Sequence, residues 1–139
     1  IVCANLPYYI TSPVIMKLPE EKLPNAPSQA QINAALEKEA QAIFSKLPKR
    51  ATLVALCIEG KELSSEQLAQ KFQQWATSGV SAIALVIGSS YGLHPLVKQQ
   101  AALRLSMSPM TFPHHLARVM LLEQVYRAFK INEGSLYHK

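Results

Sequence analysis

Apolar runs of strand length alternate with helical patterns along this chain, and this alternation limits its fold more than any other feature. The strand-like runs are residues 14–18, 52–58, 82–87 and 103–107. Continuously apolar strands separated by helices are typical of a parallel sheet that is covered on both faces. The sequence therefore predicts an α/β fold with a mostly parallel sheet flanked by helices.

Capping signals predict where the first two helices begin and end. Ser28 is expected to cap a helix whose apolar residues recur every three or four positions, and Pro48 stops that helix. Ser64 and Gln67 have the spacing of a capping box before the next helix, which Gly79 closes.

Similar signals divide the rest of the chain. Gly60 is expected to end the second strand, and a short helix is predicted within residues 94–102. Pro113 suits the first turn of a long helix that reaches about Lys130. Residues 131–139 then form a polar tail.

Composition excludes several classes of protein. A length of 139 residues, 49% of them hydrophobic, fits one domain with its own core. The chain has no aspartate, which excludes EF-hand loops, aspartyl dyads and a Walker-B aspartate. No membrane span or signal peptide is expected, and Cys3 and Cys57 are predicted to be reduced, buried thiols of a cytosolic protein. Because the chain begins at Ile1 without a Met, we expect its natural start to lie upstream.

Positive charge gathers in the last third of the chain. Residues 1–93 hold eight Lys or Arg and seven Glu, whereas residues 94–139 hold six and two, together with all four histidines. A polyanion such as RNA would be met there. An ordinary solvated surface can carry the same excess, so charge alone leaves both interpretations open.

Three loops follow the carboxyl ends of the later predicted strands: the loop after Ile58, the loop from Gly88, and residues 107–112. Ligands of parallel sheets bind at that edge, so a site is predicted there. The GSSYGL motif at residues 88–93 matches neither the dinucleotide-binding fingerprint nor a P-loop, so neither function is predicted.

Neither a metal site nor a catalytic nucleophile is predicted. His114 and His115 have no further His or Cys at ligand spacing, and on a helix they point about 100° apart, so at most one faces a site. Arg127 and the terminal residues 137–139 supply cations and an aromatic ring that could stack and pair with RNA. A frayed terminus is the alternative.

Five stretches identify a family: LPEEKLPNAPS, LVALCIEGKELSSEQLA, ALVIGSSYGLHP, MTFPHHLARVMLLEQVYRAF and the terminal YHK. With them, residues 18–139 resemble the bacterial 23S ribosomal RNA pseudouridine N3-methyltransferases, the ribosomal large-subunit methyltransferase H family of the SPOUT class. The resemblance implies a knotted α/β domain over residues 18–139, with a C-terminal trefoil knot. It implies a cytoplasmic homodimer that uses S-adenosylmethionine and acts on 23S rRNA.

The resemblance also implies roles for individual residues. The target would be N3 of a pseudouridine in helix 69 of the 23S rRNA. His138 is the candidate for handling the N3 proton, and Tyr137 and Arg127 are candidates for orienting the base and the charge. The tail of one subunit is expected to meet the partner's cofactor site, so a monomer should be inactive. The cofactor-binding positions would be Leu56, Gly88, Met107, Ser108, Pro109, Met110, Thr111 and Phe112.

Two features depart from the family pattern. The family has Gly-Gly where this chain has Gly88-Ser89, and the Cβ of Ser89 would narrow the turn if its φ were positive. Residues 1–17 form an atypical segment in place of the family's first strand and helix. Their NLPYYI motif resembles that of ribosomal RNA adenine N6-dimethyltransferases, in which the matching residues 5–8 would hold the target adenine. The glycine-rich cofactor motif of those enzymes is missing, so we interpret this segment as a graft, a fusion scar or a gene remnant.

These departures leave a second hypothesis for function. The chain could be a catalytically impaired RNA-binding protein that keeps the knotted fold but lost activity through its altered N-terminus and Ser89. This hypothesis predicts no heat of cofactor binding, whereas an enzyme predicts a saturable one. A fragment of the adenine dimethyltransferase is a weaker interpretation, because the rest of the chain contradicts it.

Overall fold

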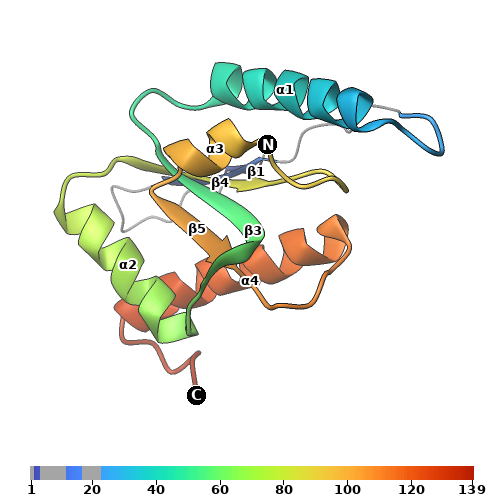
Figure 1. The fold of residues 1–139 in the computed structure, drawn as a ribbon. Helices are drawn as coiled ribbons and strands as arrows, with labels where there is room; N and C mark the ends of the chain where they lie inside the picture. Colours follow the sequence, from blue (N-terminus) through green and yellow to red (C-terminus); the bar gives the residue numbers. More distant parts are fainter. Residues whose placement is uncertain (1, 4–11, 17–22) are drawn as a thin grey trace.

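An open β-sheet runs through the middle of the molecule, with helices packed on both of its faces (Figure 1). The computed structural model describes residues 2–3, 12–16 and 23–139. In chain order, the described elements are β1 (Val2–Cys3), β2 (Ser12–Met16), α1 (Gln29–Lys46), β3 (Thr52–Glu62), α2 (Ser65–Thr77), β4 (Ala82–Ile87), α3 (Pro95–Gln100), β5 (Leu103–Ser106) and α4 (His114–Asn132).

The strands lie in the order β1-β2-β4-β3-β5. Strands β2, β4, β3 and β5 run parallel to one another, and β1 joins β2 as an antiparallel edge strand. The predicted α/β class with a mostly parallel sheet is therefore confirmed. Because the strands are parallel, the loops that follow β3, β4 and β5 all leave the same edge of the sheet.

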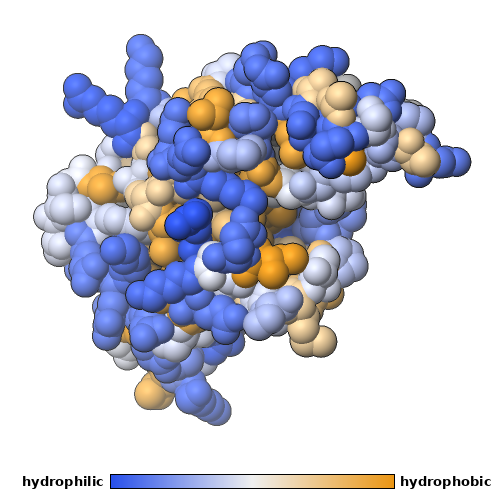
Figure 2. Space-filling model, viewed as in Figure 1, coloured by the Kyte–Doolittle hydropathy of each residue, from blue (hydrophilic) through white to orange (hydrophobic). Residues whose placement is uncertain are grey.

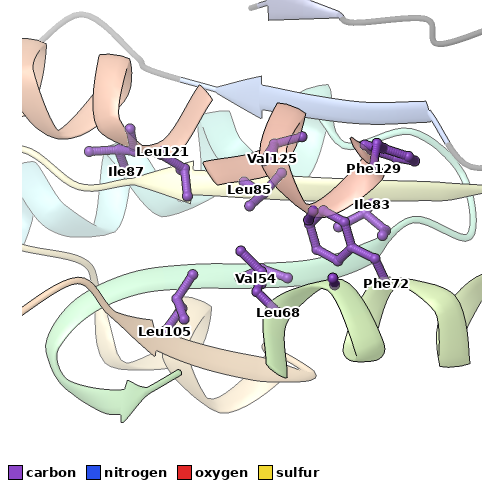
Figure 3. Packing of buried hydrophobic residues seen from close by; sticks show 12 residues of the cluster. Val54, Leu68, Phe72, Ile83, Leu85, Ile87, Leu105, Leu121, Val125 and Phe129 are labelled. Carbon is purple, nitrogen blue, oxygen red and sulfur yellow. The ribbon is translucent and has the colours of Figure 1, made fainter. Parts of the chain in front are cut away.

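The two faces of the sheet carry separate buried clusters. Helices α1 and α3 cover one face, and α2 and α4 cover the other (Figure 1). Successive side chains of a strand point to opposite faces, so β3 sends Leu53 and Ala55 toward α1 and α3 but Val54 toward α2 and α4. The second cluster also holds Phe72 and Leu121, and Figure 3 shows these helices packing on the strands.

The predicted helix caps are present. The Ser28 hydroxyl accepts a hydrogen bond from the Gln31 N–H at 3.3 Å, and the Ser64 hydroxyl accepts one from the Gln67 N–H at 3.2 Å. Both serines complete capping boxes, because each glutamine side chain reaches back to the serine N–H. Pro113 differs from the prediction, since it is the N-cap of α4 and lies just before the first turn.

Strand β3 continues past the predicted stop at Gly60. Leu56 and Lys61 both pair with Leu105 of β5, so residues 57–60 bulge out of the ladder before β3 resumes. A Cβ on Gly60 would lie 2.8 Å from the backbone of Arg104, so glycine here permits the two strands to approach. Gly60 therefore keeps β3 against β5 and does not end the strand.

The bulge also changes the expected burial of two residues. Ile58 is 52% exposed, although it belongs to the predicted buried run. Cys57 is a free cysteine, and it is half-buried where full burial was predicted. Residues in a bulge break the strict alternation of side chains between the two faces of the sheet, so their side chains point in new directions.

Polar and charged residues cover most of the face seen in Figure 2, with apolar residues exposed in small patches between them. Within the described part of the chain, no helix combines the length and the apolar character that crossing a membrane requires. The trefoil knot stays a prediction from the resemblance.

Part of the atypical N-terminal segment joins the sheet. Strands β1 and β2 both lie within residues 1–17, and β2 pairs with β4 along its whole length. The NLPYYI motif, with residues 5–8, lies outside the described residues. The division between residues 1–17 and 18–139 remains a prediction.

Candidate active site

A cavity of about 390 Å³ lies where the loops after β3, β4 and β5 meet. This is the edge of the sheet at which the sequence placed a ligand, and the volume is within the range of small-molecule sites. Seven of the eight predicted cofactor residues line it, and Pro109 does not. The seven are Leu56, Gly88, Met107, Ser108, Met110, Thr111 and Phe112.

The turn after β4 forms one wall of this cavity, and Gly88 has no room for a side chain. A Cβ built on Gly88 would lie 2.4 Å from the carbonyl oxygen of Gly92. Gly92 has a φ of 88°, and its N–H donates a 2.9 Å hydrogen bond to the Ser89 carbonyl. The chain therefore folds tightly back on itself here, and only glycine fits at position 88.

Ser89 does not strain this turn. Among the described non-glycine residues, only Arg50 has a positive φ. The φ of Ser89 is therefore not positive, and its Cβ does not narrow the turn. The Ser89 hydroxyl is buried without a hydrogen-bond partner, and the residue lines the cavity wall. A buried hydroxyl without a partner carries a cost in stability.

The loop after β5 forms the opposite wall, and serines hold its shape. The Ser106 hydroxyl donates a 3.1 Å hydrogen bond to the carbonyl of Ser108. The Ser108 hydroxyl accepts a 3.0 Å bond from the Met110 N–H. These local bonds tighten the loop so that its backbone and the side chains of Met107 and Met110 face the cavity.

An ion pair spans the rim of the cavity. Lys98 of α3 donates a hydrogen bond to the Glu59 carboxylate in the β3 bulge, and both residues line the cavity. The contact with Lys98 holds the pKa of Glu59 below its ordinary value. Burial raises the pKa of the neighbouring Cys57 thiol, so this cysteine is not activated as a nucleophile.

Only one of the two histidines at the start of α4 lines the cavity, in agreement with the prediction that at most one faces a site. His114 lines the cavity and His115 does not, although their ring centroids are 5.5 Å apart. Among the described residues, no group of three or more His, Cys, Asp or Glu is arranged to hold a metal ion.

The predicted catalytic residues form a second cluster, away from the cavity lining. The guanidinium of Arg127 donates to Glu123 from Nε at 2.9 Å, and it lies 4.9 Å from the ring centroid of Tyr137. The Tyr137 hydroxyl donates to the same carboxylate at 3.3 Å. His138 bridges Arg127 and Glu66, with nitrogen contacts of 3.3 and 2.7 Å. We call these five residues the tail cluster.

Electrostatics in the tail cluster follow from its hydrogen bonds. Bonds from Ser64, from its own backbone N–H and from His138 lower the pKa of Glu66 to about 2. The bond from Arg127 lowers the pKa of Glu123, and the same contact raises the pKa of Arg127. Both carboxylates are therefore ionised at neutral pH, and Tyr137 and His138 of the tail lie against them.

A family model described as "Predicted SPOUT methyltransferase" matches residues 6–138 of this chain. The match spans nearly the whole sequence. The chain belongs to the SPOUT methyltransferase family. SPOUT methyltransferases use S-adenosylmethionine, and membership supports methyl transfer to RNA.

The cavity of this SPOUT methyltransferase fits S-adenosylmethionine in size and chemistry. Leu56, Ile87 and Met107 supply apolar walls for an adenine ring. The glycine turn brings backbone groups close to any ligand, and Ser108 and Thr111 line the same cavity. The lining thus combines apolar walls with polar and charged groups such as Glu59, Lys98 and Thr111, as a ligand with an apolar-faced ring and charged ends requires.

Sequence reasoning missed several lining residues of this SPOUT methyltransferase. Glu59 lies in the loop after Ile58, where a site was predicted, but neither Glu59 nor Cys57 was named; both line the cavity because of the bulge, which depends on pairing with β5. Lys98 was counted only among the cations of the last third, because its contact with Glu59 depends on how α3 lies beside the β3 bulge. Glu66 and Glu123 were not singled out, and only the folded tail brings them to His138 and Tyr137.

Proposed function

We propose that this SPOUT methyltransferase transfers a methyl group to N3 of a pseudouridine in helix 69 of the 23S rRNA, in the cytoplasm. The observation that carries the proposal is the cavity, because seven of the eight residues implied by the resemblance line it. The match to the SPOUT family supports the reaction class. The RNA target rests on the resemblance.

The cavity residues would bind and orient the cofactor. When bound, S-adenosylmethionine supplies a methyl group activated by a sulfonium. The turn at Gly88 would hold its polar atoms through backbone groups, while Leu56 and Met107 pack against the adenine. These contacts would fix the direction from which the target base is methylated.

The tail cluster would act on the target base. The methyl group must arrive at N3 as the N3 proton leaves, and His138 is the candidate acceptor of that proton. Arg127 and Tyr137 would orient the base and balance its charge.

A second copy would bring the two parts of the site together. Within one chain, the cavity lining contains none of the tail-cluster residues. Helix α4 also exposes apolar side chains, with Leu116 48% and Val119 62% accessible. A symmetric homodimer that covers this face would allow the tail of one subunit to reach the cavity of the other.

The proposal makes a different prediction from the impaired-protein hypothesis. Titration with S-adenosylmethionine in a calorimeter should give saturable heat, and the protein should methylate ribosomes that lack the modification. Sedimentation at micromolar concentration should give about twice 15.4 kDa. The absence of both heat and methyl transfer would favour the impaired protein, and cofactor binding without methyl transfer would refute the proposed reaction.

Introducing a charge on the exposed face of α4 tests whether this face forms the dimer interface. Val119→Glu should yield monomers that bind cofactor more weakly or not at all and that transfer no methyl group. Leu96→Glu is the matched control, because Leu96 is 48% exposed on α3, which covers the opposite face of the sheet. If Val119→Glu remains an active dimer, α4 is not the interface.

A further inference from the structure

The imidazole of His138 is held by a partner on each of its nitrogens. Nε2 lies 2.7 Å from Oε1 of Glu66, and Nδ1 lies 3.3 Å from Nη1 of Arg127. Glu66 is 72 positions earlier in the chain and lies in the first turn of α2. The contact therefore belongs to the tertiary fold of the tail.

These two partners decide where the imidazole carries its proton. Arginine has only N–H donors, so Nδ1 must accept from Arg127 and carries no proton in this arrangement. Nε2 then carries the proton and donates it to the ionised carboxylate of Glu66. The arrangement selects the Nε2–H tautomer of a neutral His138.

Other contacts hold both partners in place. Glu66 accepts hydrogen bonds from Ser64 and from its own backbone N–H. Arg127 is held by Glu123, whose other oxygen accepts from Gln124 at 2.8 Å. Gln124 in turn accepts from the Ser65 hydroxyl at 2.6 Å, so a chain of hydrogen bonds joins α4 to the start of α2.

We propose that Glu66 is a positioning residue for the proton transfer, which orients His138 and stabilises the imidazolium that forms. The inference rests on the proposed function of His138. In the step, the N3 proton passes to Nδ1 of His138, the methyl group bonds to N3, and the sulfonium becomes a neutral thioether. Arg127 makes the longer contact and must leave Nδ1 for this transfer, whereas Glu66 stays on Nε2. A carboxylate behind a histidine plays this part in other proton-transfer sites.

The residue behind His138 can be changed without disturbing the core. Glu66 is 55% exposed in its side chain, so Glu66→Gln and Glu66→Ala should fold, as circular dichroism would verify. Glu66→Gln keeps a hydrogen-bond acceptor but removes the charge. Glu133→Gln is the matched control, because Glu133 pairs with Lys130 at 2.8 Å and is not a partner of His138.

Two measurements test the proposal. Nitrogen and carbon NMR shifts of His138 should report the Nε2–H tautomer in the parent and in Arg127→Ala, where Glu66 alone holds the ring, and a mixture of tautomers in Glu66→Ala/Arg127→Ala. The turnover number for methyl transfer to unmodified ribosomes should fall about tenfold in Glu66→Gln and further in Glu66→Ala. KM for the ribosome and the affinity for S-adenosylmethionine should stay within about twofold of the parent values.

The outcomes separate this inference from the proposed function. Parent turnover in Glu66→Gln and Glu66→Ala overturns the positioning role, while an active parent leaves the proposed function standing. A mixture of tautomers already in Arg127→Ala, where Glu66 remains, also overturns it. A parent that binds cofactor but transfers nothing refutes the proposed function itself, and with it the positioning role. Equal losses in Glu133→Gln would assign the effect to general loss of surface charge, against the proposal.

Discussion

Replacing Gly88 with alanine tests whether the turn after β4 forms the cofactor site. The added Cβ would lie 2.4 Å from the oxygen and 2.6 Å from the carbonyl carbon of Gly92, and 3.0 Å from Cγ of Leu93. Two of these contacts are with backbone, which cannot rotate away as the end of a flexible side chain can. The turn itself must therefore shift.

The size of the shift follows from these distances. Ordinary contact begins at about 3.4 Å, so the Gly92 carbonyl must retreat by about 1 Å, and overpacking of this kind costs about 1–3 kcal/mol. Gly92 lines the cavity, so its displacement changes the wall that would hold the ligand. We expect the dissociation constant for S-adenosylmethionine to rise about 10–100-fold, which corresponds to about 1.4–2.7 kcal/mol.

Calorimetric titration with S-adenosylmethionine measures this loss, and circular dichroism should show unchanged helix content. Gly88→Val should abolish binding altogether. The adjacent change Ser89→Gly is the control, because Ser89 does not have a positive φ and should tolerate either residue with little effect on affinity. If Gly88→Ala binds the cofactor as tightly as the parent does, the turn does not form the cofactor site.

Three further predictions concern the tail, the core and acid. Deleting residues 137–139 should leave the melting temperature and the cofactor affinity nearly unchanged, because exposed ion pairs contribute little to stability. Methyl transfer should nevertheless fall at least about a hundredfold. Methyl transfer at the parent rate would show that the tail is a frayed terminus without a catalytic role. Leu121→Ala should lower the free energy of unfolding, measured in urea, by about 2–5 kcal/mol, since Leu121 is fully buried. Leu136→Ala should change it little, because Leu136 is 90% exposed. Equal losses of unfolding free energy in the two variants would contradict the assigned core. Glu66 has a folded pKa of about 2 against an ordinary 4.5, so its contacts stabilise the fold above the ordinary value and are lost as pH falls toward 2. The melting temperature should therefore decline across that window, and less steeply in Glu66→Gln; parallel declines would contradict this linkage.

Local signals in the sequence were sufficient for most of the secondary structure. Strand β4 has the predicted bounds, because an apolar run between Gly79 and Gly88 carries its own limits. The caps at Ser28 and Ser64 were equally readable, since a capping box involves residues only three positions apart. The sheet rule then placed the site, because parallel strands share one carboxyl edge.

Interactions between distant residues were not readable in the same way. The bulge at residues 57–60 exists because Leu56 and Lys61 both pair with Leu105, and nothing within LCIEGKE signals that pairing. The predicted stop at Gly60 was therefore wrong, as was the expected burial of Cys57. Both errors have one cause: the neighbouring strand, whose Leu105 lies more than forty positions after the bulge, decides the course of β3.

The sequence by itself determined the fold class and the edge of the sheet that carries the cavity. Through the family resemblance, it also pointed to seven of the residues that line this cavity. Only the tertiary structure decided how the tail is held. Tyr137 and His138 belong to a polar segment without periodicity, and their partners Glu123 and Glu66 lie 14 and 72 positions away. A hydrogen bond between such distant residues depends on the packing of α2 against α4, and that packing is a property of the whole core rather than of any local pattern.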